Sequence, residues 1–343
     1  MPFPLSGAGV NFGSDKSARE DSALACLTPR CFPPAVFASR NRGTIVASLL
    51  FAVLLWGGNN AGVKFMVRSW PPLWIGGTRF LCAGLLLFAI LRWTNWLGRA
   101  ETPSAEVKRR LWWRGGLSLA VYIAAFNWAV HFTAVSHVAL YLGAAPVWAL
   151  LWEGAAGRDR RELAKRYLAA ILALVGVLVL FWPALRSGHS SLMGEFLGLA
   201  CSALWTNYGR QCRALGAHLS GAAITAHTMW RAGLLLLPFA LLEAGTRGVP
   251  WNARVVLVQL YCIVAGGVMA FALWNNALRH WKTSEVYLFN NLIPLSTMLW
   301  AHFCLGEVMT ATFWLAMALI VSGVVLGQTN WEKLFAARWL PAE

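Results

Sequence analysis

The sequence predicts an all-α membrane protein whose ten transmembrane helices form two inverted five-helix repeats. The first observation behind this prediction is composition, because 58% of the 343 residues are hydrophobic and only 13% are charged. A soluble protein of this size could not bury so much apolar surface. The second observation is that apolar runs of about 20 residues, the length that crosses a bilayer, recur throughout the chain. The third is that segments in the second half of the chain are similar in sequence to segments in the first half.

Ten apolar runs supply the predicted spans. Backbone polar groups in lipid must be hydrogen-bonded within the protein, and these runs lack the two-residue alternation of a barrel strand, so we expect helices. The predicted spans are 45–66, 72–92, 112–133, 137–154, 166–182, 193–212, 222–243, 255–277, 284–304 and 309–328. The short connections between most of them make neighbouring spans antiparallel.

The spans divide into two halves with a tail at each end. Residues 43–183 form the first predicted repeat and residues 191–330 the second, and Pro, Gly and Ser cluster at the boundary near 183–192. Residues 1–42 have no apolar run long enough to cross a membrane or to act as a signal-peptide core. We therefore expect residues 1–42 to be a disordered cytoplasmic tail and residues 331–343 a second cytoplasmic tail.

The repeat is clearest between the segments 127–146 and 275–294. The aligned pairs, called counterparts below, include Asn127 and Asn275, Ser136 and Ser284, Leu140 and Leu288, Pro146 and Pro294, and, with small shifts of register, Trp56 and Trp205, and Arg79 and Arg231. Because each half has an odd number of spans, the two halves thread the membrane in opposite orientations. Inverted repeats of this kind are typical of alternating-access carriers with a site near the bilayer midplane.

The distribution of charge predicts the orientation in the membrane. A net charge of +15 would suggest nucleic acid as the partner of a soluble chain. Here the basic residues gather in loops on one side, among them Arg99, Lys108 and Arg158, whereas the expected outer loops 134–136 and 305–308 contain no Lys or Arg. By the positive-inside rule, both termini lie in the cytoplasm of an integral plasma- or inner-membrane protein. We expect no nucleic-acid partner.

Cofactor and metal chemistry have no visible motif in the sequence. The seven cysteines show no paired or metal-binding spacing. No nucleotide-binding loop, zinc-protease motif or hydrolase nucleophile motif occurs. We therefore expect no cofactor, no metal and no enzymatic activity.

Several motifs resemble those of the drug/metabolite transporter superfamily, of the EamA type with ten helices. They are LLWGGNNAGVK in the first span, GGTRFLCAG in the second, TAVSHVALYLGAAPVWALLWEG across the third and fourth, and WKTSEVYLFNNLIPLSTMLWAHFCLGEVMT in the second half. The resemblance covers about residues 43–330 and implies secondary transport of a solute without ATP hydrolysis. One departure is that Glu153 follows Pro146 by seven residues, whereas Glu307 follows Pro294 by thirteen, so the end motif is not faithfully duplicated.

Amide and tryptophan side chains within the spans are the main candidates for substrate binding. A buried amide is costly in hydrocarbon unless it is hydrogen-bonded, so each faces a cavity or another helix. The resemblance implies that the first, fourth, sixth and ninth spans line the cavity. The predicted substrate-binding residues are Trp56, Asn59, Trp205, Asn207, Arg231, Asn290 and Asn291.

Two arginines lie well inside predicted spans. An Arg near a helix centre costs on the order of 2.5–3.5 kcal/mol on insertion scales, so something must offset that cost. Arg79 follows Pro72 by only seven residues and can snorkel to the outer surface, so we favour a structural role for it. Arg231 lies deeper, and capture of a substrate carboxylate and a structural contact remain equally open for it.

Prolines and histidines suggest how transport could work. Pro146 and Pro294 lie at matching depths and can bend their helices, either during transport or as static kinks. No Asp or Glu lies in the middle of a span. His131 and His227 are therefore the candidates for proton coupling, although a satisfied hydrogen-bonding role is the more common one for a single His. We expect facilitated diffusion or weak proton coupling.

These observations predict a secondary transporter, and more specifically an exporter, of a small metabolite such as an amino acid. Its partners would be the small-molecule substrate and the lipid bilayer, and it would be a monomer or a homodimer. A non-transporting membrane receptor or assembly subunit, an intramembrane enzyme or lipid-handling protein, and a channel are the alternatives. The internal repeat argues against the receptor, assembly subunit and enzyme, and no ring of like charges marks a channel filter.

Overall fold

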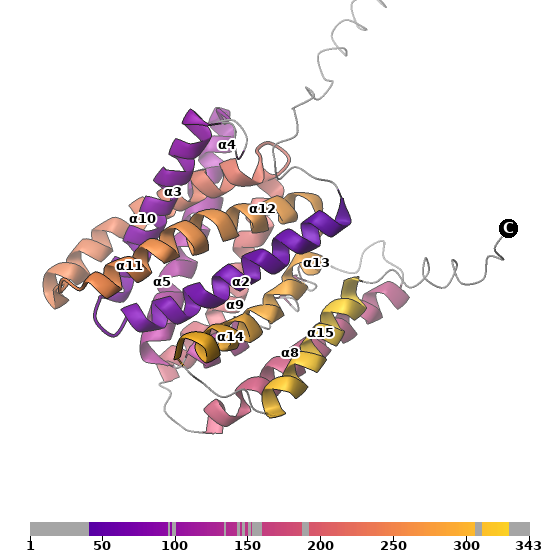
Figure 1. Ribbon diagram of the computed structural model, residues 1–343. Coiled ribbons are helices and arrows are strands. Elements are labelled where there is room, and N and C mark those ends of the chain that lie inside the picture. The colour runs from indigo at the N-terminus through magenta and orange to yellow at the C-terminus, as the bar shows by residue number, and fades with distance from the viewer. Residues whose placement is uncertain are drawn as a thin grey trace, which may run out of the picture. The chain divides into compact units, whose positions relative to one another are not determined.

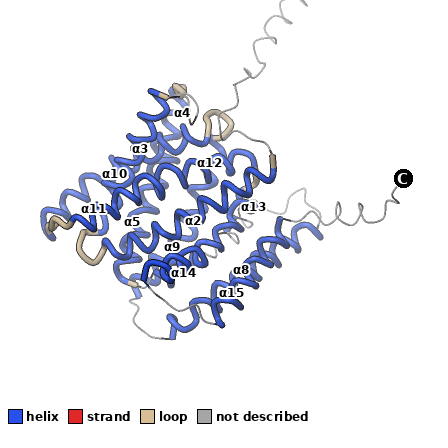
Figure 2. Tube along the Cα trace, viewed as in Figure 1, coloured by secondary structure: helices blue, strands red, loops and turns tan. Residues whose placement is uncertain are grey.

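The computed structural model describes most of the chain between residues 41 and 328. The gaps are 95–96, 98–100, 134, 143–144, 146–147, 150–151, 153–159, 187–191 and 306–310. Every regular element in the described residues is a helix (Figure 2), which confirms the all-α class. Both predicted tails, apart from Asn41 and Arg42, lie outside the described residues, as do Pro146 and Glu153.

Within the described residues, five helices are long and apolar enough to cross a membrane (Figure 1). They are α2 (Arg42–Met66), α3 (Pro72–Trp93), a continuous helix over Ala105–Phe132, α10 (Gly221–Arg247) and a continuous helix over Ala253–His280. Large apolar side chains such as Phe51, Leu85 and Leu242 are exposed on these helices. Exposed apolar surface of this extent is suited to lipid rather than to water.

Both continuous helices contain a π-helical segment. The first consists of α4 (Ala105–Arg110), the π-helix η2 (Leu111–Gly116) and α5 (Leu117–Phe132). The second consists of α11 (Ala253–Tyr261), the π-helix η3 (Cys262–Met269) and α12 (Ala270–His280). Each π segment carries a Gly-Gly pair that allows a close approach. A Cβ on Gly266, for example, would lie 2.5 Å from Oδ1 of Asn59.

The remaining helices are shorter or less apolar. They are α6 (Val135–Leu142), α8 (Arg160–Arg186), α9 (Leu192–Leu215), α13 (Thr283–Tyr287), the 3-10 segment η4 (Leu288–Leu292), α14 (Ile293–Leu305) and α15 (Ala311–Gln328). The 3-10 segment comes directly before Pro294, which has no N–H to donate to the carbonyl of Asn290. The N–H of Ile293 donates to that carbonyl instead.

Side chains and one glycine define several helix ends. Asn41, Ser104, Ser220 and Asn252 each accept a hydrogen bond from a backbone N–H in the first turn of the following helix. Such N-caps satisfy donors that have no partner within the helix. Helix α10 ends at Gly248, whose φ of 74° is readily adopted only by glycine.

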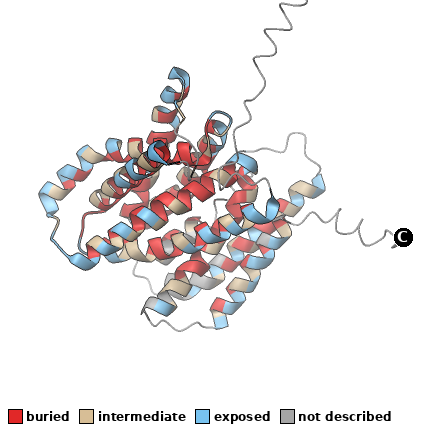
Figure 3. Cartoon of the chain, turned by 45° about the horizontal axis from the view of Figure 1, so that its top comes forward, coloured by how far each residue is buried: buried red, intermediate tan, exposed pale blue. Residues whose placement is uncertain are grey.

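Helices from the two halves pack in reciprocal pairs. Helix α3 packs on α10, and α8 packs on α15, beside it in Figure 1. Helix α2 of the first half contacts η3 and α12 of the second half. The reciprocal contact joins α9 of the second half to α5 of the first half. In the same way α2 packs on α14 and α6 packs on α9. The buried residues in Figure 3 gather where these helices face one another.

The contact between α3 and α10 brings the two backbones together. A Cβ added to Gly84 would lie 2.2 Å from the backbone nitrogen of Trp230, and one added to Gly233 would lie 2.4 Å from that of Leu81. Leu81 and Gly233 are counterparts in the register that aligns Arg79 with Arg231. The two helices therefore cross where equivalent positions meet. Glycine is needed at this crossing because a Cβ would overlap the main chain of the other helix.

We expect Gly84→Ala to destabilise the protein, because its new Cβ would meet main-chain atoms that cannot move aside as a side chain can. The cost should be about 1–3 kcal/mol, as for other overpacked sites, and should lower the melting temperature in detergent. Gly245→Ala, in α10 with nothing within 4 Å of its new Cβ, is the matched control and should be neutral or slightly stabilising. Equal effects of the two substitutions would contradict this account of the α3–α10 contact.

Candidate functional site

A small cavity lies where helices of the two halves meet. Its volume is about 30 Å³, roughly the share of one water molecule in the liquid. Its lining residues, all buried except the half-buried Tyr122, are Trp56, Asn59, Asn60, Arg79, Phe80, Tyr122, Phe126, Leu142, Trp205, Phe271, Asn290 and Ile293. Helices α2, α3, α5 and α6 supply the first eight, and α9, α12, η4 and α14 supply the last four.

Trp56 and Trp205, which are counterparts in the repeat, contact each other in the wall of this cavity. Their ring centroids are 5.4 Å apart with an interplanar angle of 80°, an edge-to-face contact. The ring of Phe271 contacts both, at 5.0 Å from Trp56 and 5.6 Å from Trp205. The indole Nε1 of Trp56 donates to the carbonyl of Gly266 at 3.0 Å. The aromatic wall is thus held by hydrogen bonds as well as by packing.

Asn290 connects three elements at the cavity. Its Oδ1 accepts a hydrogen bond from Nε1 of Trp205 at 3.2 Å, and its Nδ2 donates to the carbonyl of Leu142 at 2.8 Å. Leu142 and Asn290 are counterparts in the register that aligns Pro146 with Pro294. The side-chain amide therefore links η4 to α9 and to the end of α6, and both its oxygen and its nitrogen have a partner.

Arg79 provides the charge in the cavity wall. Its Nη1 donates to Oδ1 of Asn59 at 3.0 Å, and its guanidinium carbon lies 4.5 Å from the ring centroid of Phe80. The arginine is only 5% exposed and the asparagine 6%. Among the described residues, no carboxylate pairs with Arg79.

Four of the seven predicted substrate-binding residues lie together in this cavity, namely Trp56, Asn59, Trp205 and Asn290. The other three do not line it. Asn207 donates from Nδ2 to Oγ of Ser118 at 3.0 Å, which joins α9 to α5. Asn291 is fully buried, and neither atom of its side-chain amide has a hydrogen-bond partner among the described residues.

Arg231 lies outside the cavity, in a cluster with aromatic residues. Its Nη1 is 3.0 Å from Nδ1 of His227 and donates to the His227 carbonyl at 2.9 Å. Its guanidinium carbon lies 4.2 Å from the ring centroid of Trp230 and 5.2 Å from that of Trp112. His131, the other predicted proton-coupling residue, packs against the ring of Trp128. Neither histidine lines the cavity.

The cavity also contains residues that were not predicted. The position of Arg79 in an apolar span indicated a special environment, because a charge there is costly. Its short distance from Pro72 favoured snorkelling of the side chain to the outer surface. The structure buries it instead. The aromatic residues Phe80, Tyr122 and Phe271 carried no signal, because apolar periodicity does not separate a side chain facing a cavity from one facing lipid.

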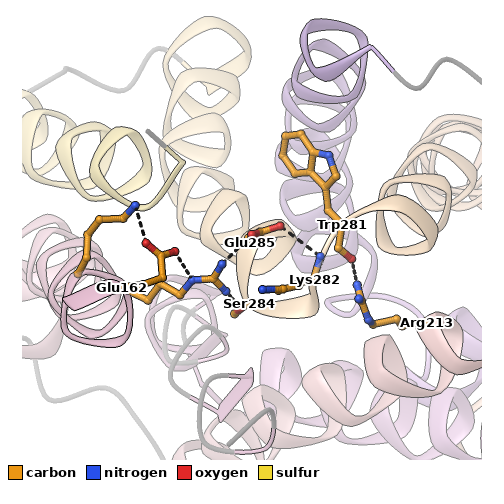
Figure 4. A network of polar contacts seen from close by, with 8 residues as sticks. Glu162, Arg213, Trp281, Lys282, Ser284 and Glu285 are labelled. Atoms are coloured by element: carbon orange, nitrogen blue, oxygen red, sulfur yellow. Dashed lines mark hydrogen bonds and ion pairs between the residues drawn. The ribbon is translucent and has the colours of Figure 1, made fainter. Parts of the chain in front are cut away.

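A second polar site joins the two halves at Arg166 (Figure 4). Its Nε donates to Glu162 at 2.9 Å, its Nη1 to Oγ of Ser284 at 3.0 Å, and its Nη2 to Glu285 at 2.8 Å. Glu285 also accepts from the backbone N–H of Lys282 at 3.2 Å. Arg166 is buried, whereas the side chains of Glu162 and Glu285 are 40% and 28% exposed, so this bridge from α8 to α13 is a charge-assisted contact whose acidic side is open to solvent.

The pKa of the Glu162 carboxyl is affected by its contact with Arg166. Burial by itself raises the pKa of Glu162, but hydrogen bonds from Arg166 and Lys165 outweigh that effect. The pKa therefore lies below its ordinary value of 4.5. The charged form of Glu162 thus stabilises the folded protein at neutral pH through Arg166 and Lys165 of its own helix, and Arg166 in turn reaches α13.

Apolar helices in two repeated halves that share a cavity lined by both are typical of a membrane transport protein. The model of the EamA-like transporter family matches residues 43–182 and 192–327, so the chain belongs to that family and has its two-repeat architecture. The first match contains the cavity residues from Trp56 to Leu142, and the second contains those from Trp205 to Ile293. The protein is therefore an integral membrane protein of a transporter family.

Three relatives from bacteria and an archaeon are similar to this chain along most of their length. An Escherichia coli K12 protein named a probable amino-acid metabolite efflux pump is 23% identical over 89% of this chain and 98% of its own. An uncharacterized transporter of Archaeoglobus fulgidus is 26% identical over 76% of this chain and 88% of its own. An uncharacterized inner membrane transporter of Escherichia coli K12 is 26% identical over 84% and 92%.

A solved crystal structure has the same fold. It aligns with a TM-score of 0.68 over 87% of this chain and 99% of its own, at 18% sequence identity. At that identity the similarity extends to the fold and no further.

We expect the stabilising effect of Glu162 to depend on pH. Because its folded-state pKa is lowered, its contribution is fully present above about pH 4.5 and is lost as the pH falls through the folded-state value. The melting temperature of the wild type should therefore exceed that of Glu162→Gln at pH 7, and the difference should shrink below pH 4.5. In an Arg166→Gln background the same comparison should give a smaller difference at pH 7. A pH-independent difference would contradict the assignment.

Proposed function

We propose that this protein is a secondary transporter that exports a small metabolite such as an amino acid by alternating access, with the central cavity as its substrate site. The observation that carries the proposal is that one cavity is lined by both repeated halves and combines amides, a cation and aromatic rings. A site shared by two halves can be exposed first to one side of the membrane and then to the other when the halves rock against each other.

The inverted arrangement of the repeats is supported by contacts between counterparts. Trp56 contacts Trp205, Leu142 accepts a hydrogen bond from Asn290, and Leu81 lies against Gly233. A position that touches its own counterpart lies close to a two-fold axis. With five spans in each half, that axis would lie in the membrane plane, and ten spans would cross the bilayer.

The small volume of the cavity supports a transport cycle with a closed state. Ligand pockets generally measure about 300–1,000 Å³, whereas this one measures about 30 Å³. A metabolite can bind only if the halves separate on one side. The bridge from Arg166 to Glu285 joins the halves, and we propose that it breaks and forms again as the site opens and closes on the cytoplasmic side.

Two further features fit this cycle. The 3-10 segment before Pro294 is a point where the helix can bend, and we propose the same role for its counterpart Pro146. His131 and His227 are the proposed residues for any proton coupling. The contact of His227 with Arg231 also suits a purely structural role.

The cargo and direction are proposed from relatives and from charge. The name of the Escherichia coli relative points to amino-acid metabolites and to efflux. The positive-inside distribution and the inner-membrane relative favour an inner-membrane location with both termini in the cytoplasm. No cofactor or resident metal is part of the proposal, and the protein would act as a monomer or homodimer. One observation favours the alternative of a non-transporting subunit, namely that both polar groups of the Asn290 side chain already have partners.

Transport in proteoliposomes tests the proposal. Trp205→Ala removes a ring that faces the cavity, and Asn290→Ala removes the amide that holds this ring. Each should reduce uptake of amino acids, measured as exchange across the vesicle membrane, by at least about tenfold, because loss of roughly 1.4 kcal/mol of substrate binding gives that factor. Trp93→Ala is the matched control, since Trp93 is 81% exposed at the end of α3, and it should transport normally.

Folding must be separated from function in this test. The variants should insert at wild-type levels and elute as single species in detergent. If folded Trp205→Ala and Asn290→Ala vesicles transport at the wild-type rate, the cavity is not the substrate site. If the wild type moves none of the solutes offered, the receptor or subunit alternative is favoured over transport.

A further inference from the structure

We propose that Arg79 is the anion-binding residue of this cavity and that the cargo is an amphipathic carboxylate, held through its carboxylate group by the guanidinium. This inference rests on the proposed function, because it takes the cavity to be the substrate site. It assigns charge capture to Arg79 rather than to its counterpart Arg231, for which the sequence left substrate capture and a structural contact equally open.

The first argument is the charge balance of the cavity. Arg79 is the one charged residue among the twelve that line it, and no carboxylate in the described part of the chain pairs with it. A buried charge without an opposite charge is unfavourable. The neutral oxygen of Asn59 and the face of Phe80 compensate only in part. A bound carboxylate would supply the missing charge.

The second argument is that the guanidinium is held in place. Arginine presents five N–H donors in a planar fork that matches a carboxylate, and the bond from Nη1 to Asn59 fixes the orientation of that fork. Asn59 is itself confined, because its side chain lies against Gly266 of η3 and its carbonyl is 3.9 Å from Sγ of Cys262. Neighbouring helices therefore pre-organise the donor group, which lowers the cost of binding.

The third argument is the rest of the wall. Around Arg79 the cavity presents the rings of Trp56, Phe80, Phe126 and Phe271, with amides but no acidic side chain. Such a wall suits an apolar side chain attached to the carboxylate. The positive charge, with no acid to offset it, disfavours a cationic amine that lacks a carboxylate.

Arg231 is in a different position although it occupies the matching place in the repeat. Its Nη1 is occupied by the ring nitrogen and the carbonyl of His227, and its charge lies over Trp230 and Trp112. It lines no part of the cavity. The hydrogen bonds of Arg231 all use its Nη1, and its buried Nε has no hydrogen-bond partner among the described residues. The assignment of the ligand to Arg79 therefore rests on the place of Arg79 in the cavity wall, which Arg231 does not share.

Thermal-shift binding in detergent at pH 7 tests the inference. The probes are the apolar L-amino acids, each beside its carboxamide and its decarboxylated amine. Ligands that bind the native state raise its melting temperature. We expect at least one amino acid to do so, and neither its amide nor its amine. Arg79→Gln should weaken binding of that amino acid by at least about tenfold, whereas Arg254→Gln, a matched change at an exposed residue on α11, should leave the affinity unchanged.

A second variant and a transport measurement keep the test decisive. Arg79→Lys retains the charge without the fork, so it should bind more weakly than the wild type and more tightly than Arg79→Gln; it also serves if Arg79→Gln fails to fold. If the wild type transports a solute but its amide is carried as well, or Arg79→Gln binds the acid normally, the inference is overturned and the proposed function stands. The inference is also overturned, and the proposed function stands, if Arg231→Gln abolishes binding of the amino acid and Arg79→Gln does not. If the wild type neither binds nor transports any probe, both the inference about Arg79 and the proposed transport function are overturned.

Discussion

Contact between equivalent positions of the two halves is the constraint on which the rest of the structure depends. The backbones of α3 and α10 touch at Gly84 and Gly233, and the rings of Trp56 and Trp205 meet at the centre. Within a membrane there is little hydrophobic drive between helices, so close packing of small residues and interlocked rings must hold them together. Because the cavity lies at this meeting point, its shape is set by the same contacts that hold the halves together.

Polar groups at the centre are positioned by the need to find partners inside the protein. The amide of Asn290 is bonded on both sides, and Asn59 is bonded to Arg79. A hydrogen bond between membrane helices contributes only about 0.6–2 kcal/mol, so these bonds add more to the geometry of the site than to overall stability. Asn59, Arg79 and Asn290 are each held by a hydrogen bond to another element, which fixes the orientation of these polar groups in the site.

The sequence predicted the helical class, because the apolar runs have the length of membrane-spanning helices. It predicted the two repeats, because motifs of the first half align with motifs of the second. It also predicted Trp56, Asn59, Trp205 and Asn290, whose polarity or duplication stands out in apolar spans. It did not predict that Arg79 is buried in the cavity wall, since the distance of Arg79 from Pro72 along the chain says nothing about which neighbours cover it. Arg79 is enclosed by aromatic residues of other helices, and such contacts between distant segments cannot be read from spacing.

The difference between Arg79 and Arg231 has a consequence for the energy of the proposed cycle. Two identical inverted halves would exchange roles in the inward-open and outward-open states, so both states would have the same free energy and equal populations. Here one half places its arginine in the cavity and the other places it against His227, Trp112 and Trp230. In the proposed cycle, the divergence of this duplicated residue would break the degeneracy, and the empty protein would have a preferred resting side.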